Sequence, residues 1–357
     1  MALKLKERGH EVVVLSDEKQ QYPELPGELA QAGIKHYTTD AIDRLDPVSM
    51  FKGVKDLKTI FRKEGVFEII HAGGIKHVVK TYLATKGLNE KPKTFATIRS
   101  LPRSKIGMAM AVISYNSLVN KCIALCNYTK REMEKWGVNS DKIVAIPIFA
   151  PDLEWFDDAR RRDMPLKRYG LQHVDRPVVF YAASHVYYKG FLYYLKAAKK
   201  VLRRFDGTFI VGGQGPLTEN LKDLSRRLGI HEHVFFTGWI SNYHMPYVLS
   251  NIADICVSAS LREQFPSYIM ECMAARKPVI ATKVGGVPEA VEDGVNGYLV
   301  PPREPNALSN KIIRLIEEPK EAKKMGGEGR KIVKQRFNME MAAADLSKVY
   351  EMVTHER

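Results

Sequence analysis

The hydrophobic positions of the chain fall into short apolar runs that alternate with longer amphipathic segments. Runs such as Phe67–His71 and Thr94–Ile98 are typical of strands that are buried on both faces. Segments such as Val48–Glu64 and Phe191–Phe205 carry apolar residues at helical spacing. Because strands and helices alternate in this way, the pattern predicts parallel sheets with helices on both faces, which is an α/β fold.

The same pattern places the other elements of the chain. Further strands are predicted at Glu11–Leu15, Gly33–Thr39, Lys121–Leu125, Ile143–Ile148, Pro177–Ala183, Thr208–Val211, Val234–Phe236, Ile255–Ser258, Lys277–Thr282 and Tyr298–Val300. Further helices are predicted at Lys76–Lys86, at a segment ending in Trp136, and at Ser267–Ala275, Asn306–Glu317, Pro319–Arg336 and Met339–Val353. Residues 157–175 are rich in Arg, Asp and Pro and poor in apolar residues, which indicates a linker. We therefore predict one domain over residues 1–156 and a second over residues 176–338.

Composition sets the class of protein. The chain has 357 residues, of which 45% are apolar and 27% are charged, as in globular proteins with two domains. The longest apolar run, Ile106–Tyr115, is too short to span a bilayer. The four cysteines are scattered without a zinc pattern, so we expect reduced, buried thiols and a cytoplasmic protein.

Positive charge is concentrated in one part of the chain. The net charge is +14, and residues 51–105 hold 13 Lys and Arg against four Asp and Glu. Such a region suits an anionic membrane surface, an acidic glycan or nucleic acid, and the simpler alternative is a solvated face. No interleaved aromatic stripe supports a nucleic-acid partner. A peripheral contact with the inner face of a membrane through residues 51–105 is therefore a hypothesis that rests on charge.

The main candidate functional residues lie within residues 258–302. Glu263 precedes a predicted helix, Pro266 stands at its start, and Glu271 lies about one turn inside it. A helix N-terminus favours a phosphate, and ionised carboxylates accept hydrogen bonds from hydroxyls. Phosphate and hydroxyl recognition at one helix predicts a nucleotide-sugar site. The alternative is that both acids are ordinary helix-start or half-exposed residues.

An ordered series of residues in this region resembles the retaining glycosyltransferases of family four. Glu263 and Glu271 are followed by Pro278-Val279-Ile280-Ala281-Thr282, Gly285-Gly286-x-x-Glu289 and Asp293-Gly294-x-x-Gly297. Arg276 departs from the pattern, since the family usually has glycine there. The resemblance implies the B-type glycosyltransferase fold, in which two Rossmann-like domains with parallel sheets face a cleft. It also implies that the last helix, 339–357, joins the first domain.

The resemblance also implies roles for residues of the second domain. Glu271 is expected to hold the ribose hydroxyls, Glu263 to lie by the donor sugar, and Lys189 to contact the diphosphate as a catalytic cation. The remaining expected donor-binding positions are Gln264, Phe265, Ser267, Gly215 and Gly238. Ala183-Ser184 stand where the family has Gly-Arg, so the bidentate cation that this arginine supplies in the family is absent from this sequence. The alternatives are a surface lysine for Lys189 and ordinary turns for Gly215 and Gly238.

The first domain matches the family less closely. His71 is a candidate for orienting a hydroxyl in catalysis, with a structural histidine as the alternative. Arg99 stands where the family often has His and is a candidate for binding an anionic acceptor. In the family, a strand and a glycine-rich loop precede the helix that ends at Gly9, and this sequence lacks them. We therefore expect an N-terminal truncation, with unpaired edges on two neighbouring strands and a gap in the core.

These features predict a retaining glycosyltransferase that takes a UDP- or GDP-sugar and acts on a glycan or lipid-linked saccharide. The sequence holds no Asp-x-Asp motif and no His/Asp cluster, so we expect no metal and no cofactor besides the nucleotide-sugar co-substrate. One alternative is a sugar-nucleotide epimerase or hydrolase of the same fold. Another is a non-catalytic nucleotide-sugar-binding relative.

Overall fold

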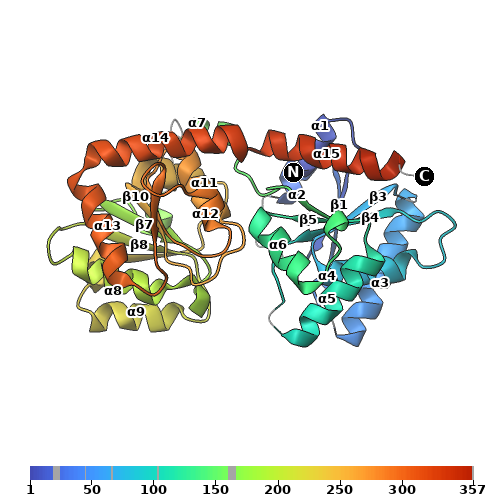
Figure 1. Ribbon diagram of the computed structural model, residues 1–357, viewed down its shortest axis with the longest axis horizontal. Helices are drawn as coiled ribbons and strands as arrows, with labels where there is room; N and C mark the ends of the chain where they lie inside the picture. The colour runs from blue at the N-terminus through green and yellow to red at the C-terminus, as the bar shows by residue number, and fades with distance from the viewer. Residues whose placement is uncertain (19–24, 45, 66, 103, 160–165, 356–357) are drawn as a thin grey trace. The chain divides into compact units, whose positions relative to one another are not determined.

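The chain forms two compact α/β units in a computed structural model (Figure 1). The structure describes residues 1–18, 25–44, 46–65, 67–102, 104–159 and 166–355. The first unit comprises Met1–Phe149 and Met339–Arg357, and the second comprises Ala150–Asn338. The C-terminal helix therefore belongs to the first unit. The predicted linker, 157–175, begins inside a helix of the second unit, and residues 160–165 lie outside the described part.

The second unit is built on one parallel sheet of six strands. Its order is β12-β11-β10-β7-β8-β9. The strands are β7 (Val178–Ala182), β8 (Thr208–Gly212), β9 (Val234–Gly238), β10 (Ile255–Ser258), β11 (Val279–Thr282) and β12 (Gly297–Val300). From β7 the chain proceeds to β8 and β9 on one side of the sheet and to β10, β11 and β12 on the other. The sheet therefore reverses its direction of growth between β7 and β10, which is where open α/β sheets bind ligands.

Helices cover both faces of this sheet (Figure 1). They are α7 (Leu153–Ala159), α8 (Phe191–Val201), α9 (Thr218–Arg227), α10 (Met245–Tyr247), α11 (Ser267–Ala274), α12 (Val287–Ala290), α13 (Pro305–Glu317) and α14 (Pro319–Arg336). Helix α8 packs beside α13, and α11 packs beside α14. The β7 and β10 residues between them are almost wholly buried, for example Val179 and Val257. Burial on both faces explains why these strands are continuous apolar runs.

The first unit holds two separate parallel sheets. One pairs β1 (Val13–Asp17) with β2 (Lys35–Thr39). The other has the order β3-β4-β5-β6, formed by Ile69–Ala72, Lys93–Ile98, Lys121–Ala124 and Ile143–Ala145. The helices are α1 (Ala2–Glu7), α2 (Leu25–Gln31), α3 (Pro47–Glu64), α4 (Ile75–Thr85), α5 (Lys105–Leu118), α6 (Asn127–Trp136) and α15 (Met339–His355). Figure 1 shows α3, α4 and α5 on one face of the strands, with α1 and α15 on the other.

A cavity of about 590 Å³ lies between the two sheets of the first unit. Val13 of β1 contributes to one wall, and Ile69 and His71 of β3 contribute to the other. Within the described residues, no strand joins β1 to β3. In the described part of the chain, β1 and β3 each therefore have one unpaired edge.

Six α-helices among the described residues were not predicted from the sequence: α2, α5, α7, α9 and the short α10 and α12. The remaining major elements lie within a few residues of their predicted bounds, and Pro266 directly precedes α11 instead of opening it. All four cysteines are free and buried, as predicted. No helix among the described residues is long and apolar enough to cross a membrane.

Candidate active site

The predicted donor-site residues of the second unit meet at the carboxyl ends of β7 and β10. Lys189 ends a short 3₁₀ helix, Tyr187–Lys189, that follows β7. Glu263 lies in the loop between β10 and α11. Since β7 and β10 are neighbours at the point where the sheet reverses, both loops face the same crevice.

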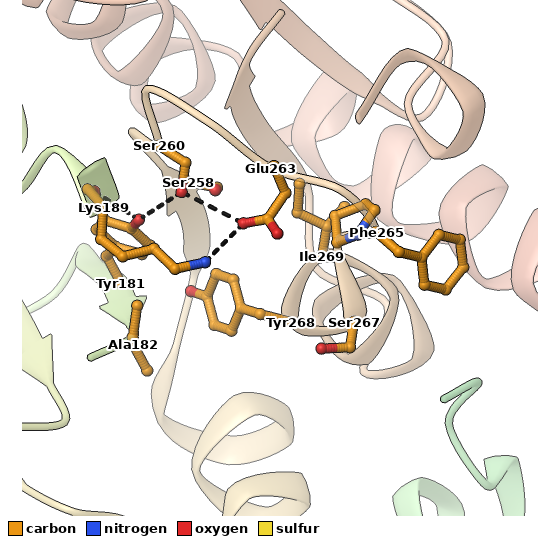
Figure 2. A pocket seen from close by; sticks show the side chains of 12 residues that line it. Tyr181, Ala182, Lys189, Ser258, Ser260, Glu263, Phe265, Ser267, Tyr268 and Ile269 are labelled. Atoms are coloured by element: carbon orange, nitrogen blue, oxygen red, sulfur yellow. Dashed lines mark hydrogen bonds and ion pairs between the residues drawn. The ribbon is translucent and has the colours of Figure 1, made fainter. Parts of the chain in front are cut away.

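Lys189 and Glu263 form a partly buried ion pair (Figure 2). The Lys189 Nζ donates to Glu263 Oε2 over 2.7 Å, and the two side chains are 21% and 16% exposed. Burial by itself would lower the pKa of Lys189, but the negative charge of Glu263 outweighs it and the pKa is raised. Lys189 is therefore a permanent cation at this position.

Two buried hydroxyls hold the pair in place. Tyr181 of β7 donates its hydroxyl proton to the backbone oxygen of Lys189 over 2.7 Å and lies 3.1 Å from the Ser260 hydroxyl. Ser260 in turn donates to Glu263 Oε2 over 3.4 Å. Burial raises the pKa of Tyr181 to about 12, so its hydroxyl keeps its proton at neutral pH. Nothing in the sequence pointed to these hydroxyls, because Tyr181 lies within an apolar strand.

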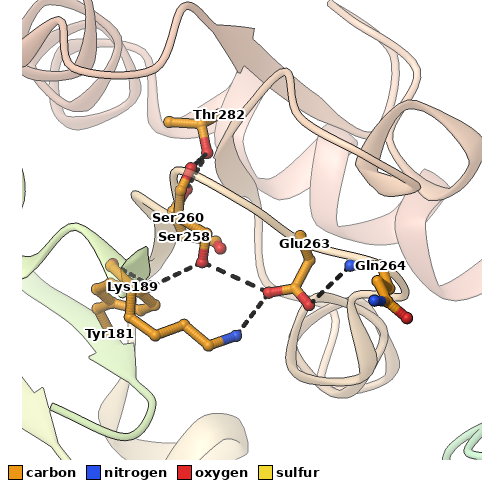
Figure 3. Close-up of polar contacts among 7 residues, drawn as sticks. All are labelled: Tyr181, Lys189, Ser258, Ser260, Glu263, Gln264 and Thr282. Atoms are coloured by element: carbon orange, nitrogen blue, oxygen red, sulfur yellow. Dashed lines mark hydrogen bonds and ion pairs between the residues drawn. The ribbon is translucent and has the colours of Figure 1, made fainter. Parts of the chain in front are cut away.

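The Glu263 loop is anchored from the neighbouring strand (Figure 3). Thr282, at the end of β11, donates a short hydrogen bond to the backbone oxygen of Ser260. Gly285 follows with φ +55, and a Cβ added there would lie 1.5 Å from the Glu263 carbonyl oxygen. Only glycine fits that contact. The paired glycines therefore fix the loop that carries Glu263.

A second glycine brings the Lys189 loop against the end of β10. Gly190 has φ +67, and an added Cβ would lie 1.9 Å from the carbonyl oxygen of Ala259. The Lys-Gly dipeptide thus has a steric requirement for its glycine. Gly215 plays a similar part, since its added Cβ would lie 2.8 Å from the backbone of His185. Gly238 has φ +65 and open space around it, as in an ordinary turn.

Helix α11 begins at the pocket between these loops. A small pocket of about 50 Å³ is lined by Lys189, Glu263 and the start of α11, including Ser267 (Figure 2). Among the described residues that line it, Lys189 is the one basic side chain. The pocket is smaller than the several hundred cubic ångströms typical of a whole ligand site, so it accounts for part of a ligand only.

Glu271 lies in the second turn of α11 with its side chain partly buried. Burial raises its pKa from 4.5 to about 7. Among the described residues, no hydrogen-bond or ion-pair partner of its carboxylate is present. A carboxylate that loses solvation without gaining a partner is a candidate for binding a ligand.

Two other predicted donor residues have different surroundings. The side chain of Phe265 is buried against Phe337, with ring centroids 6.1 Å apart, so only its backbone is at the pocket. The backbone N–H of Gln264 donates to Glu263 Oε1 over 3.2 Å. Gln264 therefore helps to orient the Glu263 carboxylate.

The backbone conformation at Arg276 explains why the family usually has glycine at this position. Arg276 follows α11 with φ +60, a conformation that favours glycine. Its N–H donates to the Met273 carbonyl oxygen over 3.0 Å. This chain therefore places an arginine in a helix-ending position that suits glycine.

In the first unit, His71 has the contacts of a structural histidine. Its Nδ1 lies 2.5 Å from the Tyr350 hydroxyl of α15, and its Nε2 lies 2.7 Å from the Thr97 hydroxyl of β4. Burial lowers the pKa of His71 to about 4, so it is neutral at physiological pH. Both ring nitrogens are engaged, which favours the structural alternative. Arg99 follows β4, is exposed, and stacks over Phe149 at 5.6 Å.

Comparisons with known proteins identify relatives of both halves of the chain. A family model described as Glycosyltransferase Family 4 matches residues 1–151, and one described as Glycosyl transferases group 1 matches residues 166–332. An alpha-D-kanosaminyltransferase of Streptomyces kanamyceticus is 31% identical over 55% of this chain and 50% of the relative. A GDP-mannose-dependent phosphatidylinositol monomannoside mannosyltransferase of Mycolicibacterium smegmatis is 35% identical over 54% of this chain and 49% of the relative. The chain thus spans about half the length of these relatives.

Solved structures agree with the fold. A glycosyltransferase from Rickettsia africae superimposes with a TM-score of 0.80 at 23% identity and covers 100% of this chain and 93% of that one. Anabaena HepE, solved in complex with UDP-glucose, has a TM-score of 0.77 at 20% identity and covers 96% of this chain and 100% of that one. At these identities the likeness concerns the fold.

Proposed function

Because this chain belongs to the glycosyltransferases with the family-four type of GT-B fold, we propose that it transfers a sugar from a UDP- or GDP-sugar to a glycan or lipid-linked saccharide with retention of configuration. The GDP-mannose dependence of the mycobacterial relative and the UDP-glucose complex of Anabaena HepE support the two nucleotides as candidates. The relatives' names also support a carbohydrate or lipid-linked acceptor.

The observation that carries the proposal is the carboxylate of Glu271, half-buried without a partner one turn inside a helix whose start faces Lys189 and Glu263. Ribose hydroxyls would supply the hydrogen bonds that this carboxylate lacks. Lys189 and the N-terminus of α11 would hold the diphosphate, and Glu263 would accept hydrogen bonds from the sugar.

In the proposed reaction, the bond between the anomeric carbon and the diphosphate oxygen breaks. An acceptor oxygen forms the new bond on the same face of the sugar. The acceptor proton passes to the leaving diphosphate, whose growing charge Lys189 and the helix N-terminus stabilise in place of a metal. Transfer that continues undiminished in the presence of EDTA would support that last assignment.

The test is calorimetry with UDP and GDP on the wild type, on Glu271→Ala, and on Glu317→Ala as a control. Glu317 is a partly exposed acid paired with Arg204 at the end of α13. We expect one nucleotide to bind, Glu271→Ala to weaken it, and Glu317→Ala to leave it unchanged. If neither nucleotide binds, or if both variants bind as the wild type does, the proposed donor site is wrong.

The acceptor side of the proposal involves the first unit. Arg99 is exposed after β4 and would suit an anionic group of the acceptor. A lipid-linked acceptor would also bring the basic residues of 51–105 near an anionic membrane.

A further inference from the structure

Helix α5 carries an exposed apolar face. Ile106, Met110 and Ile113 are 76%, 56% and 66% exposed. They recur at the spacing that places residues on one side of a helix. The opposite side packs into the first unit through Ala111 and Tyr115, which are buried.

The helix also has no charge along its length after Lys105. A surface helix normally presents charged residues to water, and a helix that is apolar all round is normally buried. Helix α5 lies between α4 and α6 with its outer face uncovered. An exposed apolar face of this kind marks a site of interaction.

The surroundings of α5 are predominantly basic, although α6 also carries Glu134 and Glu132, which pair with Lys130 and Lys135. From Lys91 to Arg131, the sequence holds eight Lys and Arg and no Asp or Glu. Arg99 and Lys105 near the start of α5 and Arg131 on α6 are exposed. An apolar helix face bordered by cations matches the chemistry of an anionic lipid bilayer, in which the apolar residues enter the acyl boundary and the cations contact the headgroups.

A second copy of this chain fits the same face poorly. A symmetric dimer would bring the two basic surfaces together, and like charges at an interface oppose association. The positive charge around α5 therefore favours docking on an anionic bilayer over self-association of the chain.

We propose that α5 docks on an anionic membrane, with Ile106, Met110 and Ile113 inserted at the headgroup boundary. This surface lies mostly beyond the basic region 51–105 to which the charge of the sequence pointed. The inference deepens the proposed function and rests on it for the identity of a lipid-linked acceptor. Docking itself needs no donor, so it is measured separately.

The first test is co-sedimentation with vesicles of phosphatidylcholine alone and of phosphatidylcholine and phosphatidylglycerol in equal parts. We expect the protein to bind the anionic vesicles and not the neutral ones. Ile106→Ser and Ile113→Ser should each weaken binding about tenfold, and the triple variant with Met110→Ser should abolish it. Met352→Ser is the control, because Met352 is 56% exposed on α15.

The second test reports insertion directly. Since all four native cysteines are buried, an environment-sensitive dye can be attached to Ile113→Cys or to Met352→Cys. The emission should shift to shorter wavelength on vesicles for the Ile113→Cys label only. An unchanged spectrum there would overturn the proposal.

Three other results would also overturn it: no binding to anionic vesicles, equal binding by the triple variant, or a wild-type dimer that the triple variant converts to monomer. The last would assign the face to a second copy. A protein that binds UDP or GDP but no vesicles would retain the proposed function and lose this surface. A protein that binds vesicles but neither UDP nor GDP would retain the proposed membrane surface and lose the proposed function.

Discussion

Replacing Glu271 with glutamine is expected to stabilise the protein above neutral pH while it weakens nucleotide binding. Burial raises the pKa of Glu271 from 4.5 to about 7. Between those values the folded protein holds a proton that the unfolded chain has released. The free energy of unfolding therefore falls as the pH rises from 4.5 to 7, and this contribution is constant above 7.

The size of the effect follows from the two pKa values. At 1.36 kcal/mol for each unit of pKa, the interval sets a ceiling of about 3 kcal/mol. The partial exposure of Glu271 reduces this, so we expect about 1–3 kcal/mol. Glutamine has the shape of the neutral acid and carries no titrating charge. The variant should therefore match the wild type near pH 4.5 and exceed it at pH 8, with a melting temperature higher by about 2–4 °C for each kcal/mol.

The assay is thermal and urea unfolding of both proteins from pH 4.5 to 8, with calorimetry of UDP and GDP over the same range. Nucleotide affinity should fall about fivefold in the variant at pH 8, because a neutral acceptor replaces a charged one. The phosphate of the nucleotide titrates in the same way in the experiments with both proteins. Its contribution to the pH dependence therefore cancels when the variant is compared with the wild type. A stability gain that is equal at pH 4.5 and pH 8 would refute the reasoning, since it would not arise from the Glu271 carboxylate.

Three further changes test the framework of the site. Gly190→Ala should lower the free energy of unfolding by about 3 kcal/mol or more, because the alanine would be left-handed and its Cβ would also clash with the Ala259 carbonyl oxygen. Gly238→Ala places a left-handed alanine in open space, so it should lower the free energy of unfolding by only about 1–2 kcal/mol. Urea titration measures both values. Lys189→Met should lower the free energy of unfolding by about 3 kcal/mol, because it leaves Glu263 partly buried and unpaired. Adding Glu263→Gln should restore most of that stability. A double variant less stable than Lys189→Met would contradict the ion-pair account. Arg276→Gly should raise the free energy of unfolding by about 1 kcal/mol, and no gain would show that its φ of +60 carries no strain.

The alternation of apolar runs and amphipathic segments predicted most of the fold because it reports burial directly. Helix α5 was not predicted, because its exposed side is apolar as well and its hydrophobic residues therefore show no helical periodicity. Helix α7 is short, and its last three residues fall in the segment 157–175 that was predicted as a linker.

The candidate site was predictable where its residues follow strands. Glu263 and Lys189 lie 74 positions apart in the sequence, and the reversal of the sheet between β10 and β7 brings them together. The supporting hydroxyls of Tyr181 and Ser260 were not predictable, because their role depends on which strands become neighbours. His71 had the right sequence position for an active residue, but Tyr350, 279 positions away, engages its ring.

The ion pair suggests how the site would distinguish a nucleotide-sugar from a free nucleotide. A diphosphate that draws Lys189 away leaves Glu263 partly buried without its partner, which is unfavourable. A sugar compensates by donating its hydroxyls to Glu263, whereas UDP or GDP alone offers none. Glu263→Gln should therefore bind the nucleoside diphosphate more tightly than the wild type, because Lys189 is released, and should lose about tenfold of the preference for the nucleotide-sugar. Calorimetry with both ligands measures this difference. A variant that weakens both ligands equally would place Glu263 in the support of the loop and not in contact with the sugar.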